Sequence, residues 1–440
     1  MTTLILEGSK YAMIFLMIFY AYLNFRFFGE KYDIRKLKLC REQNAVMFLI
    51  HFLGFLSLYL NRREEEILVF YGAQVVFFGL YLVLSRLFYR NISRLLLNNM
   101  CMLLSVGFLM LARLDMERAV RQFAIVAVSA AVTWLIPFII DRVWQLSKIP
   151  WVYGIGGLLL LAVVCVAGVT SYGAKMTLAL GPVSFQPAEF VKISFVFFVA
   201  TMFYRATDFK TAAVTTAVAA AHVLVLVLSR DLGNALIFFL TYLFMLFVAT
   251  GNWFYLGTGL AAGCGASAAA YHLFPHVQRR VAAWLDPWSD VADKGYQIAQ
   301  SLFAIGTGGW LGMGLDRGLP ERIPVVEEDF MISAVAEELG GLFAVCLILI
   351  CLGCFLQFMM IAVRMQAMFY KLIAFGLGCE YIVQVFLTVG GAVKFIPLTG
   401  VTLPLVSYGG SSVAGTFILF SVIQGLYILK RNEEEEDEEK

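Results

Sequence analysis

Long apolar runs separated by short polar segments dominate the chain from end to end. A run of about 20 apolar residues can cross a bilayer as a helix, and a helix satisfies its own backbone hydrogen bonds inside lipid. The pattern therefore predicts an all-α polytopic membrane protein with about thirteen spans. The predicted spans are residues 11–25, 45–60, 67–85, 96–112, 122–140, 151–168, 190–204, 211–228, 232–249, 254–273, 331–361, 372–392 and 413–429.

Four connections between these runs carry the unusual polar sequence, at 169–189, 229–232, 274–330 and 394–412. Basic residues gather after the first run, which lacks a small-residue cleavage site and is expected to remain as an anchor. If that basic segment is cytoplasmic, the N-terminus lies outside, the acidic end lies inside, and all four connections lie outside. The large extracytoplasmic loop at 274–330 is far longer than an ordinary connection, so we expect it to carry function.

Composition supports a membrane protein and excludes several other classes. The 440 residues are 61% hydrophobic, include 39 Phe and have a mean hydropathy of +0.81, too apolar for one water-soluble core. A net charge of +2 without a basic tract argues against nucleic acid as a partner. Most of the eight cysteines lie in apolar runs and the four histidines are scattered, so no metal site of protein ligands is predicted.

Four motifs occur in order between residues 181 and 412. They are "GPVSFQPAEFVK" (181–192), "RDLGNA" (230–235), the series "RRVAAWLDPWSD", "KGYQIAQSLFAIGTGGWLGMGL" and "DFMISAVAEELG", and "IPLTGVTLPLVSYGGSS" (396–412). Together they resemble the SEDS family (shape, elongation, division and sporulation), which includes FtsW, RodA and SpoVE. The chain departs from the family pattern at Ala188, where Ser is usual, at Arg230, where Pro is usual, and in the segment "VADKGY".

The resemblance implies a ten-helix SEDS-like core over 96–431. Residues 1–95 would add about three N-terminal transmembrane helices of unknown role, and 432–440 would form an acidic cytoplasmic tail. The implied activity is that of a peptidoglycan glycosyltransferase polymerising lipid II at the outer face of the bacterial cytoplasmic membrane, in division, elongation or sporulation. The implied partners are a class B penicillin-binding protein transpeptidase and other divisome or elongasome membrane proteins. A lipid II flippase is the main alternative, and a non-catalytic scaffold for the transpeptidase is a third.

The chemistry of lipid II defines which groups are needed. Its sugar is α-linked to diphosphate and the polymer bond is β, so one displacement with inversion suffices and requires a general base for the acceptor hydroxyl. The family's essential aspartate corresponds to Asp290 of "DPWSD". Asp286 and Asp293 are its nearest rivals, although both are more simply explained as solvated loop residues.

Cations and hydroxyls near these motifs are the expected substrate-binding groups. Arg279 and Arg280 suit a diphosphate, with interfacial anchoring as the alternative. Lys394 stands alone at the expected bilayer edge, where an unpaired cation is costly. The hydroxyls of "SYGGSS" could bond sugar groups, unless the segment merely shapes a re-entrant turn. These hydroxyls belong to Ser407, Ser411 and Ser412.

Acidic residues outside the aspartate loop have more varied interpretations. Glu189 and Lys192 are spaced i, i+3 and are expected to pair inside the bundle, with a structural or a substrate-binding role. Asp231 is interpreted as a cap or turn residue. Four of the five acids at 327–338 are interpreted here: Asp329 and Glu337 are expected to line the cavity, and Glu328 and Glu338 to be solvated or interfacial. A bridging divalent cation, Mg²⁺ or Mn²⁺, stays open because no ligand cluster predicts one.

Overall fold

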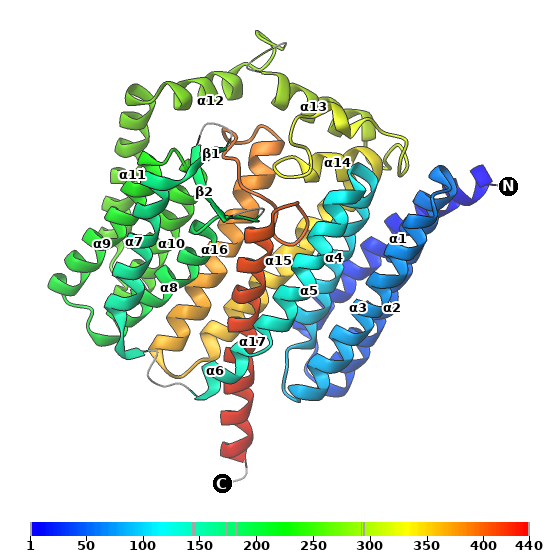
Figure 1. The fold of residues 1–440 in the computed structure, drawn as a ribbon. Helices are drawn as coiled ribbons and strands as arrows, with labels where there is room; N and C mark the ends of the chain where they lie inside the picture. Colours follow the sequence, from blue (N-terminus) through cyan, green and yellow to red (C-terminus); the bar gives the residue numbers. More distant parts are fainter. Residues whose placement is uncertain are drawn as a thin grey trace. The chain divides into compact units, whose positions relative to one another are not determined.

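The computed structural model describes residues 2–142, 147–171, 174–180, 183–291, 293 and 295–438. It consists of helices and one small sheet (Figure 1). The elements are α1 (Thr2–Gly29), α2 (Asp33–Arg62), α3 (Glu65–Phe88), α4 (Arg94–Leu114), α5 (Met116–Thr133), α6 (Ile136–Arg142), α7 (Pro150–Ala167), β1 (Val169–Ser171), β2 (Ala174–Leu180), β3 (Val183–Phe185), α8 (Ala188–Arg205), α9 (Phe209–Leu228), α10 (Leu232–Thr250), α11 (Trp253–Leu273), α12 (Pro275–Leu285), α13 (Tyr296–Gly308), η2 (Pro320–Arg322), α14 (Met331–Glu338), α15 (Gly341–Arg364), α16 (Met368–Ala392) and α17 (Gly410–Glu438).

The predicted spans fall on helices, with one break inside the run 331–361, and this confirms the polytopic helical fold. Among the described residues, 11 helices are long and apolar enough to cross a membrane. The helices α8 and α11 occupy predicted spans but are not among those 11.

Two details of the prediction were wrong. The run 331–361 is not one helix, because α14 ends at Glu338 and Gly340, with φ +97°, turns the chain before α15. A side chain at Gly340 would meet the backbone nitrogen of Gly312 at 2.6 Å, so this turn requires glycine. The predicted span 122–140 lies within one candidate membrane span, Met116–Ile140, although the helix is interrupted between α5 and α6. The 169–189 connection, expected to be a loop, contains the antiparallel sheet β1-β2-β3, so the fold is not purely helical.

The chain divides into two compact units. The first unit comprises residues 1–132, 281–354 and 388–409. In it α2 packs on α1, α3 and α4, drawn blue to cyan in Figure 1, and α13 packs on α14. The helix α4 is buried along its whole apolar length, so it forms the core of this unit.

Polar contacts join the first helices to α4 inside this unit. Asn99 of α4 donates to Oδ1 of Asn24 on α1 at 2.9 Å and accepts from the hydroxyl of Tyr20 at 3.1 Å. Asn98 donates to the backbone oxygen of Cys40 on α2 at 2.9 Å. Because buried amides need partners, these bonds fix the register of α1 and α2 on α4.

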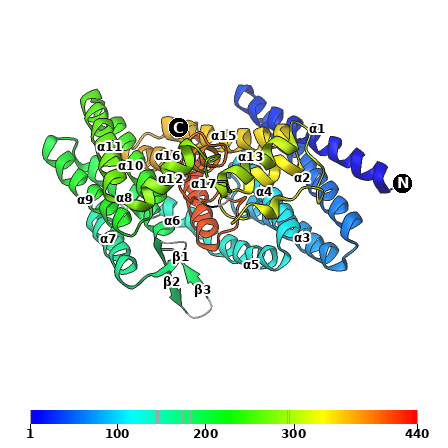
Figure 2. The same cartoon turned by 90° about the horizontal axis from the view of Figure 1, so that it is seen from above.

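The second unit comprises residues 133–280, 355–387 and 410–440. Its helices α7, α8, α9, α10 and α11 pack on one another, and the small sheet lies beside α7 (Figure 2). The helix α17 packs against α6 and α8. It continues through the acidic residues to Glu438, and Glu434 pairs with Lys430 at 2.7 Å.

Candidate functional site

A tight turn after α12 holds Asp290. The backbone oxygen of Asp290 accepts from Gly295 N at 2.9 Å, and the carboxylate of Asp286 accepts from Trp288 N at 3.1 Å. Gly295 packs so closely that a side chain there would lie 2.1 Å from the backbone oxygen of Pro287. The turn is therefore a defined structure, even though Ala292 and Lys294 lie outside the described residues.

Burial distinguishes Asp290 from its two rivals. Its side chain is half-buried, whereas Asp286 and Asp293 are exposed. The carboxylate of Asp286 is also engaged in the turn itself. Of the three aspartates, Asp290 is the one whose environment differs from a solvated loop.

The end of α12 connects this turn to Lys394. Trp284 donates its indole N–H to the backbone oxygen of Lys394 at 3.2 Å, and both residues belong to the first unit. Lys394 is half-buried and has φ +60°, a conformation that costs a lysine more than a glycine. The predicted role of Lys394 in binding substrate stays a prediction.

The two arginines of α12 belong to the second unit. Arg279 is exposed and Arg280 is half-buried. A spacing of four residues puts Arg280 and Trp284 on the same face of the helix. Their predicted contact with a diphosphate stays a prediction.

The predicted Glu189–Lys192 pair is confirmed and belongs to a larger buried cluster in the second unit. Lys192 Nζ lies 3.0 Å from Glu189 Oε2, 3.8 Å from Glu380 Oε1 and 2.8 Å from Gln384 Oε1. All four side chains are buried. Glu380 and Gln384 were not predicted as part of this cluster, although a lone carboxylate in the apolar run 372–392 is a signal that could have identified Glu380.

Asp231 caps α10, as predicted. Its carboxylate accepts from Asn234 N at 3.1 Å and from the Asn234 side chain at 2.9 Å. Burial raises the pKa of this carboxyl, and the bonds to Asn234 oppose that rise. The bonds satisfy the first turn of the helix, so the role is structural.

Two serines of the signature "SYGGSS" accept hydrogen bonds from backbone N–H groups. Ser407 Oγ accepts from Leu403 N at 3.1 Å, and Ser411 Oγ accepts from Gln186 N at 2.9 Å. Ser412 is buried. Sugar binding by these hydroxyls stays a prediction, since two of the three have backbone partners within their own units.

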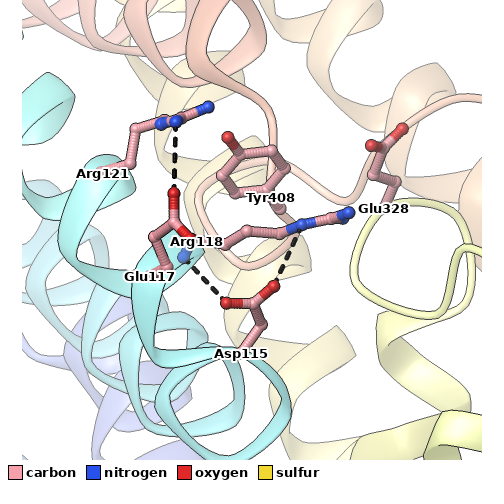
Figure 3. Close-up of a pocket in the computed structure, with 6 residues that line it drawn as sticks. All are labelled: Asp115, Glu117, Arg118, Arg121, Glu328 and Tyr408. Carbon is pink, nitrogen blue, oxygen red and sulfur yellow. Dashed lines mark hydrogen bonds and ion pairs between the residues drawn. The ribbon is translucent and has the colours of Figure 1, made fainter.

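A polar cavity of about 420 Å³ lies beside the signature segment in the first unit. Figure 3 shows the side chain of Arg118 crossing the ring of Tyr408, with 5.5 Å between the guanidinium carbon and the ring centroid. Arg118 also pairs with Asp115 at 3.3 Å and with Glu327. The cavity is lined by Asp115, Glu117, Arg118, Arg121, Glu328 and Tyr408.

Glu328 was expected to be solvated or interfacial, and it lines this cavity with its side chain half-buried. Burial and the neighbouring Asp329 carboxylate raise the pKa of Glu328, and Arg118 partly opposes that shift. The side chains of Arg118 and Tyr408 were not predicted as part of any site, because the segments that carry them lie far apart in the sequence.

The prediction for Glu338 was wrong. Its side chain is fully buried and lies 2.8 Å from Nε of Arg113. Arg113 also pairs with Glu321 at 2.7 Å and with Asp316 at 3.0 Å. The neighbouring Glu337 accepts from Leu319 N at 3.0 Å, so both glutamates hold the segment before η2. A buried cation explains why Glu338 can leave water.

No group of three or more His, Cys, Asp or Glu that could hold a metal ion occurs among the residues that the structure describes.

The comparisons with known proteins identify the family. A model of the FtsW, RodA and SpoVE family, described as cell cycle proteins, matches residues 85–432. The chain belongs to this family. The match begins near the end of α3, so most of the first three helices precede it.

Relatives from several bacteria are similar over most of the chain. The protein named peptidoglycan glycosyltransferase RodA of Mycobacterium tuberculosis is 32% identical over 383 residues, covering 80% of this chain and 82% of the relative. The probable peptidoglycan glycosyltransferase FtsW of Aliivibrio salmonicida is 35% identical over 283 residues, covering 62% of this chain and 69% of the relative.

Solved structures share the fold. A chain from "Structural coordination of polymerization and crosslinking by a peptidoglycan synthase complex" has a TM-score of 0.65 and 26% identity, covering 78% of this chain and 98% of that one. The rod shape determining protein RodA of Thermus thermophilus has a TM-score of 0.57 and 24% identity, covering 76% and 96%. The second likeness supports the fold alone.

Proposed function

We propose that this multi-pass membrane protein is a peptidoglycan glycosyltransferase that polymerises lipid II into glycan strands, with Asp290 as the general base. Family membership over residues 85–432 carries the activity, and the relatives bear that activity in their names. The half-buried Asp290 on its defined turn supports the choice of base.

The reaction follows from the bonds that change. The acceptor sugar hydroxyl attacks the anomeric carbon of the donor, the new C–O bond forms on the face opposite the diphosphate, and the anomeric C–O bond to diphosphate breaks with its electron pair. The carboxylate of Asp290 takes the proton of the attacking hydroxyl. One carboxylate is enough, because diphosphate leaves without needing an acid.

Cations are needed where the diphosphate gathers charge. Lys394 is tied through Trp284 to the helix that precedes the Asp290 turn. We assign it, with Arg279 and Arg280 of α12, to the diphosphate, because fixed cations stabilise charge that develops during bond breaking. The other proposed substrate-binding residues are Asp329 and Ser407 in the first unit, and Glu189, Lys192, Ser411 and Ser412 in the second.

The flippase alternative is not favoured. The relatives are named as glycosyltransferases, and the charge of the intramembrane Lys192 is balanced by Glu189 at 3.0 Å. A transport role would leave Asp290 replaceable, so the two functions predict opposite outcomes for a substitution of Asp290.

Polymerisation of lipid II by the purified protein tests the function. Wild type should yield glycan polymer, and Asp290→Asn should abolish it while keeping the thermal midpoint of wild type. The matched control is Asp293→Asn, which removes an exposed aspartate of the same turn and should retain activity. Polymer formed by Asp290→Asn at the wild-type rate would refute the assignment of the base.

We also propose that the Asp290 turn is extracytoplasmic, that the C-terminal end of α17 is cytoplasmic, and that the protein works with a class B penicillin-binding protein transpeptidase and other divisome or elongasome membrane proteins. The likeness to a chain of a peptidoglycan synthase complex supports the partner. Ser289 is exposed, so Ser289→Cys in a Cys264→Ser background should react with an impermeant maleimide in intact cells. Labelling only after the cells are opened would reverse the topology.

A further inference from the structure

The helices that precede the family match are joined to the core by a charged contact at the end of α2. Arg62 Nη2 lies 2.7 Å from Asp316 Oδ1, and Arg62 Nε lies 3.2 Å from both carboxylate oxygens. Both side chains are largely buried, with 26% and 16% of their surfaces exposed. A partly buried bidentate ion pair fixes the geometry of its two side chains more strongly than an exposed ion pair does.

Two further bonds strengthen this junction. Arg62 Nη2 donates to the backbone oxygen of Arg113 at 2.6 Å, and Asn61 Nδ2 donates to the backbone oxygen of Leu315 at 2.9 Å. On α1, Glu7 pairs with Arg317. Residues of α1 and α2 thus hold three consecutive positions of the core, 315–317.

The segment at 312–319 is in turn hydrogen-bonded to the C-terminal end of α14. Asp316 N donates to Glu338 Oε2 at 3.1 Å, and Gly314 N donates to the backbone oxygen of Glu338 at 2.9 Å. Asp316 has φ +64°, a strained conformation for a residue other than glycine. The contacts of Asp316 with Arg62 and Arg113 hold this conformation in place.

From α14 the contacts lead to the Asp290 turn. The hydroxyls of Ser333 on α14 and Ser301 on α13 lie 2.7 Å apart. Phe303 of α13 packs on Trp288 of the turn, with ring centroids 5.5 Å apart, and α13 begins directly after Gly295. All of these residues belong to the first unit, so the route is continuous.

We propose that α1 and α2 form an intramolecular brace, and that Arg62 is a positioning residue which fixes the segment at 312–319, and through α14 and α13 the Asp290 turn, in the geometry required for polymerisation. The proposal rests on the function given above. It gives the N-terminal helices a role in the reaction without any contact with substrate.

The variant Arg62→Gln tests the brace, and Arg63→Gln is its matched control. Arg63 is the adjacent residue, carries the same charge and is exposed, so its removal controls for the loss of a cation at this end of α2. In lipid II polymerisation, Arg62→Gln should lower kcat by roughly 2- to 30-fold with little change in KM, the range expected when coupling is altered away from substrate. Arg62→Lys should recover part of the rate, and Arg63→Gln should match wild type.

A double-mutant cycle with Asp316→Asn isolates the pair. Asparagine tolerates a positive φ, so this variant removes the charge without adding backbone strain. The fold-decrease in kcat caused by Asp316→Asn should be smaller in the Arg62→Gln background than in wild type. Fully additive effects would show that Arg62 does not act through Asp316 and would overturn the proposal.

Hydrogen exchange gives a readout that does not depend on activity. In Arg62→Gln, amides of 313–319 and of the first turn of α13 should exchange faster than in wild type and Arg63→Gln, while those of α4 stay protected. Unchanged exchange at both segments would overturn the brace even if polymerisation fails in every variant. Absence of polymer from wild type, with the expected exchange pattern, would instead contradict the proposed function and leave the brace supported.

Discussion

The side-chain amide of Gln122 binds the backbone of Ser407. Its Nε2 donates to the Ser407 oxygen at 2.9 Å, and its Oε1 accepts from Gly409 N at 3.1 Å. The two bonds flank Tyr408, whose own N donates to the backbone oxygen of Glu327 at 2.7 Å. A single buried residue near the start of α5 therefore holds the signature segment on both sides.

Gln122→Glu should destabilise the protein, because the new carboxylate cannot donate to Ser407 and would be buried beside its carbonyl. The expected loss is about 1–3 kcal/mol, the cost of leaving a buried polar group unsatisfied. The measurement is the thermal midpoint in detergent. Arg121→Gln is the control, since it changes the adjacent exposed residue. Equal midpoints for the two variants would contradict the structural role of Gln122.

Lys192→Met should destabilise the protein strongly, because it leaves the buried Glu189 and Glu380 without their cation. Breaking a buried pair by removing one partner costs about 3–5 kcal/mol. Adding Glu380→Gln should restore part of the loss by removing one of the stranded carboxylates. A double variant as unstable as the sum of the singles would show that Lys192 and Glu380 do not interact.

Gly295→Ala should reduce polymerisation, because its methyl group would lie 2.1 Å from the Pro287 carbonyl oxygen and must displace the Asp290 turn. The control is Gly306→Ala on α13, where an added carbon meets nothing within 4 Å and helix propensity improves by roughly 1 kcal/mol. The rate of polymer formation and the thermal midpoint are measured for both. An active Gly295→Ala enzyme would mean that the turn can shift without harm.

Two substitutions of Lys394 separate the effect of losing its charge from the effect of relieving its backbone strain. Lys394→Gly relieves the positive φ and removes the cation, whereas Lys394→Ala removes the cation and keeps the strain. We expect Gly to be more stable than Ala by about 1 kcal/mol, and both to raise the KM for lipid II. A KM equal to that of wild type in both variants would remove Lys394 from the diphosphate site.

Glu328 should make stability depend on pH. Because burial raises its pKa in the folded state, the unfolded chain ionises first as pH rises, and the free energy of unfolding falls across that window. Glu328→Gln removes this fall, so the thermal midpoint of the variant should gain on that of wild type as the pH rises above 4.5, the ordinary pKa of a glutamate. Glu117→Gln, which changes an exposed acid of the same cavity, should show no such gain.

Local patterns were sufficient for much of the structure. Apolar runs predicted the positions of the spans, because burial in lipid needs a continuous apolar segment. The spacing of Glu189 and Lys192 predicted their pairing, and the turn at Asp231 predicted its cap. Each of these features is decided by residues close together in the chain.

The contacts that build the site connect distant segments. Gln384 lies 192 residues from Lys192, Glu338 lies 225 residues from Arg113, and Asp316 lies 254 residues from Arg62. No periodicity or motif links such positions in a single sequence. Glu338 illustrates the consequence. Because it follows another glutamate, it was predicted to be solvated or interfacial, and only the ion pair with the distant Arg113 explains its burial.

The side-chain amides of Asn98 and Asn99 require α4 to be surrounded by protein groups that can hydrogen-bond to them. In a helix facing hydrocarbon they would be stranded, since lipid offers no hydrogen-bond partner. Here Asn24, Tyr20 and the Cys40 carbonyl replace lipid at those positions. The segment before the family match is thus an obligate part of this molecule, and a shortened version lacking it should fail to insert as a stable protein.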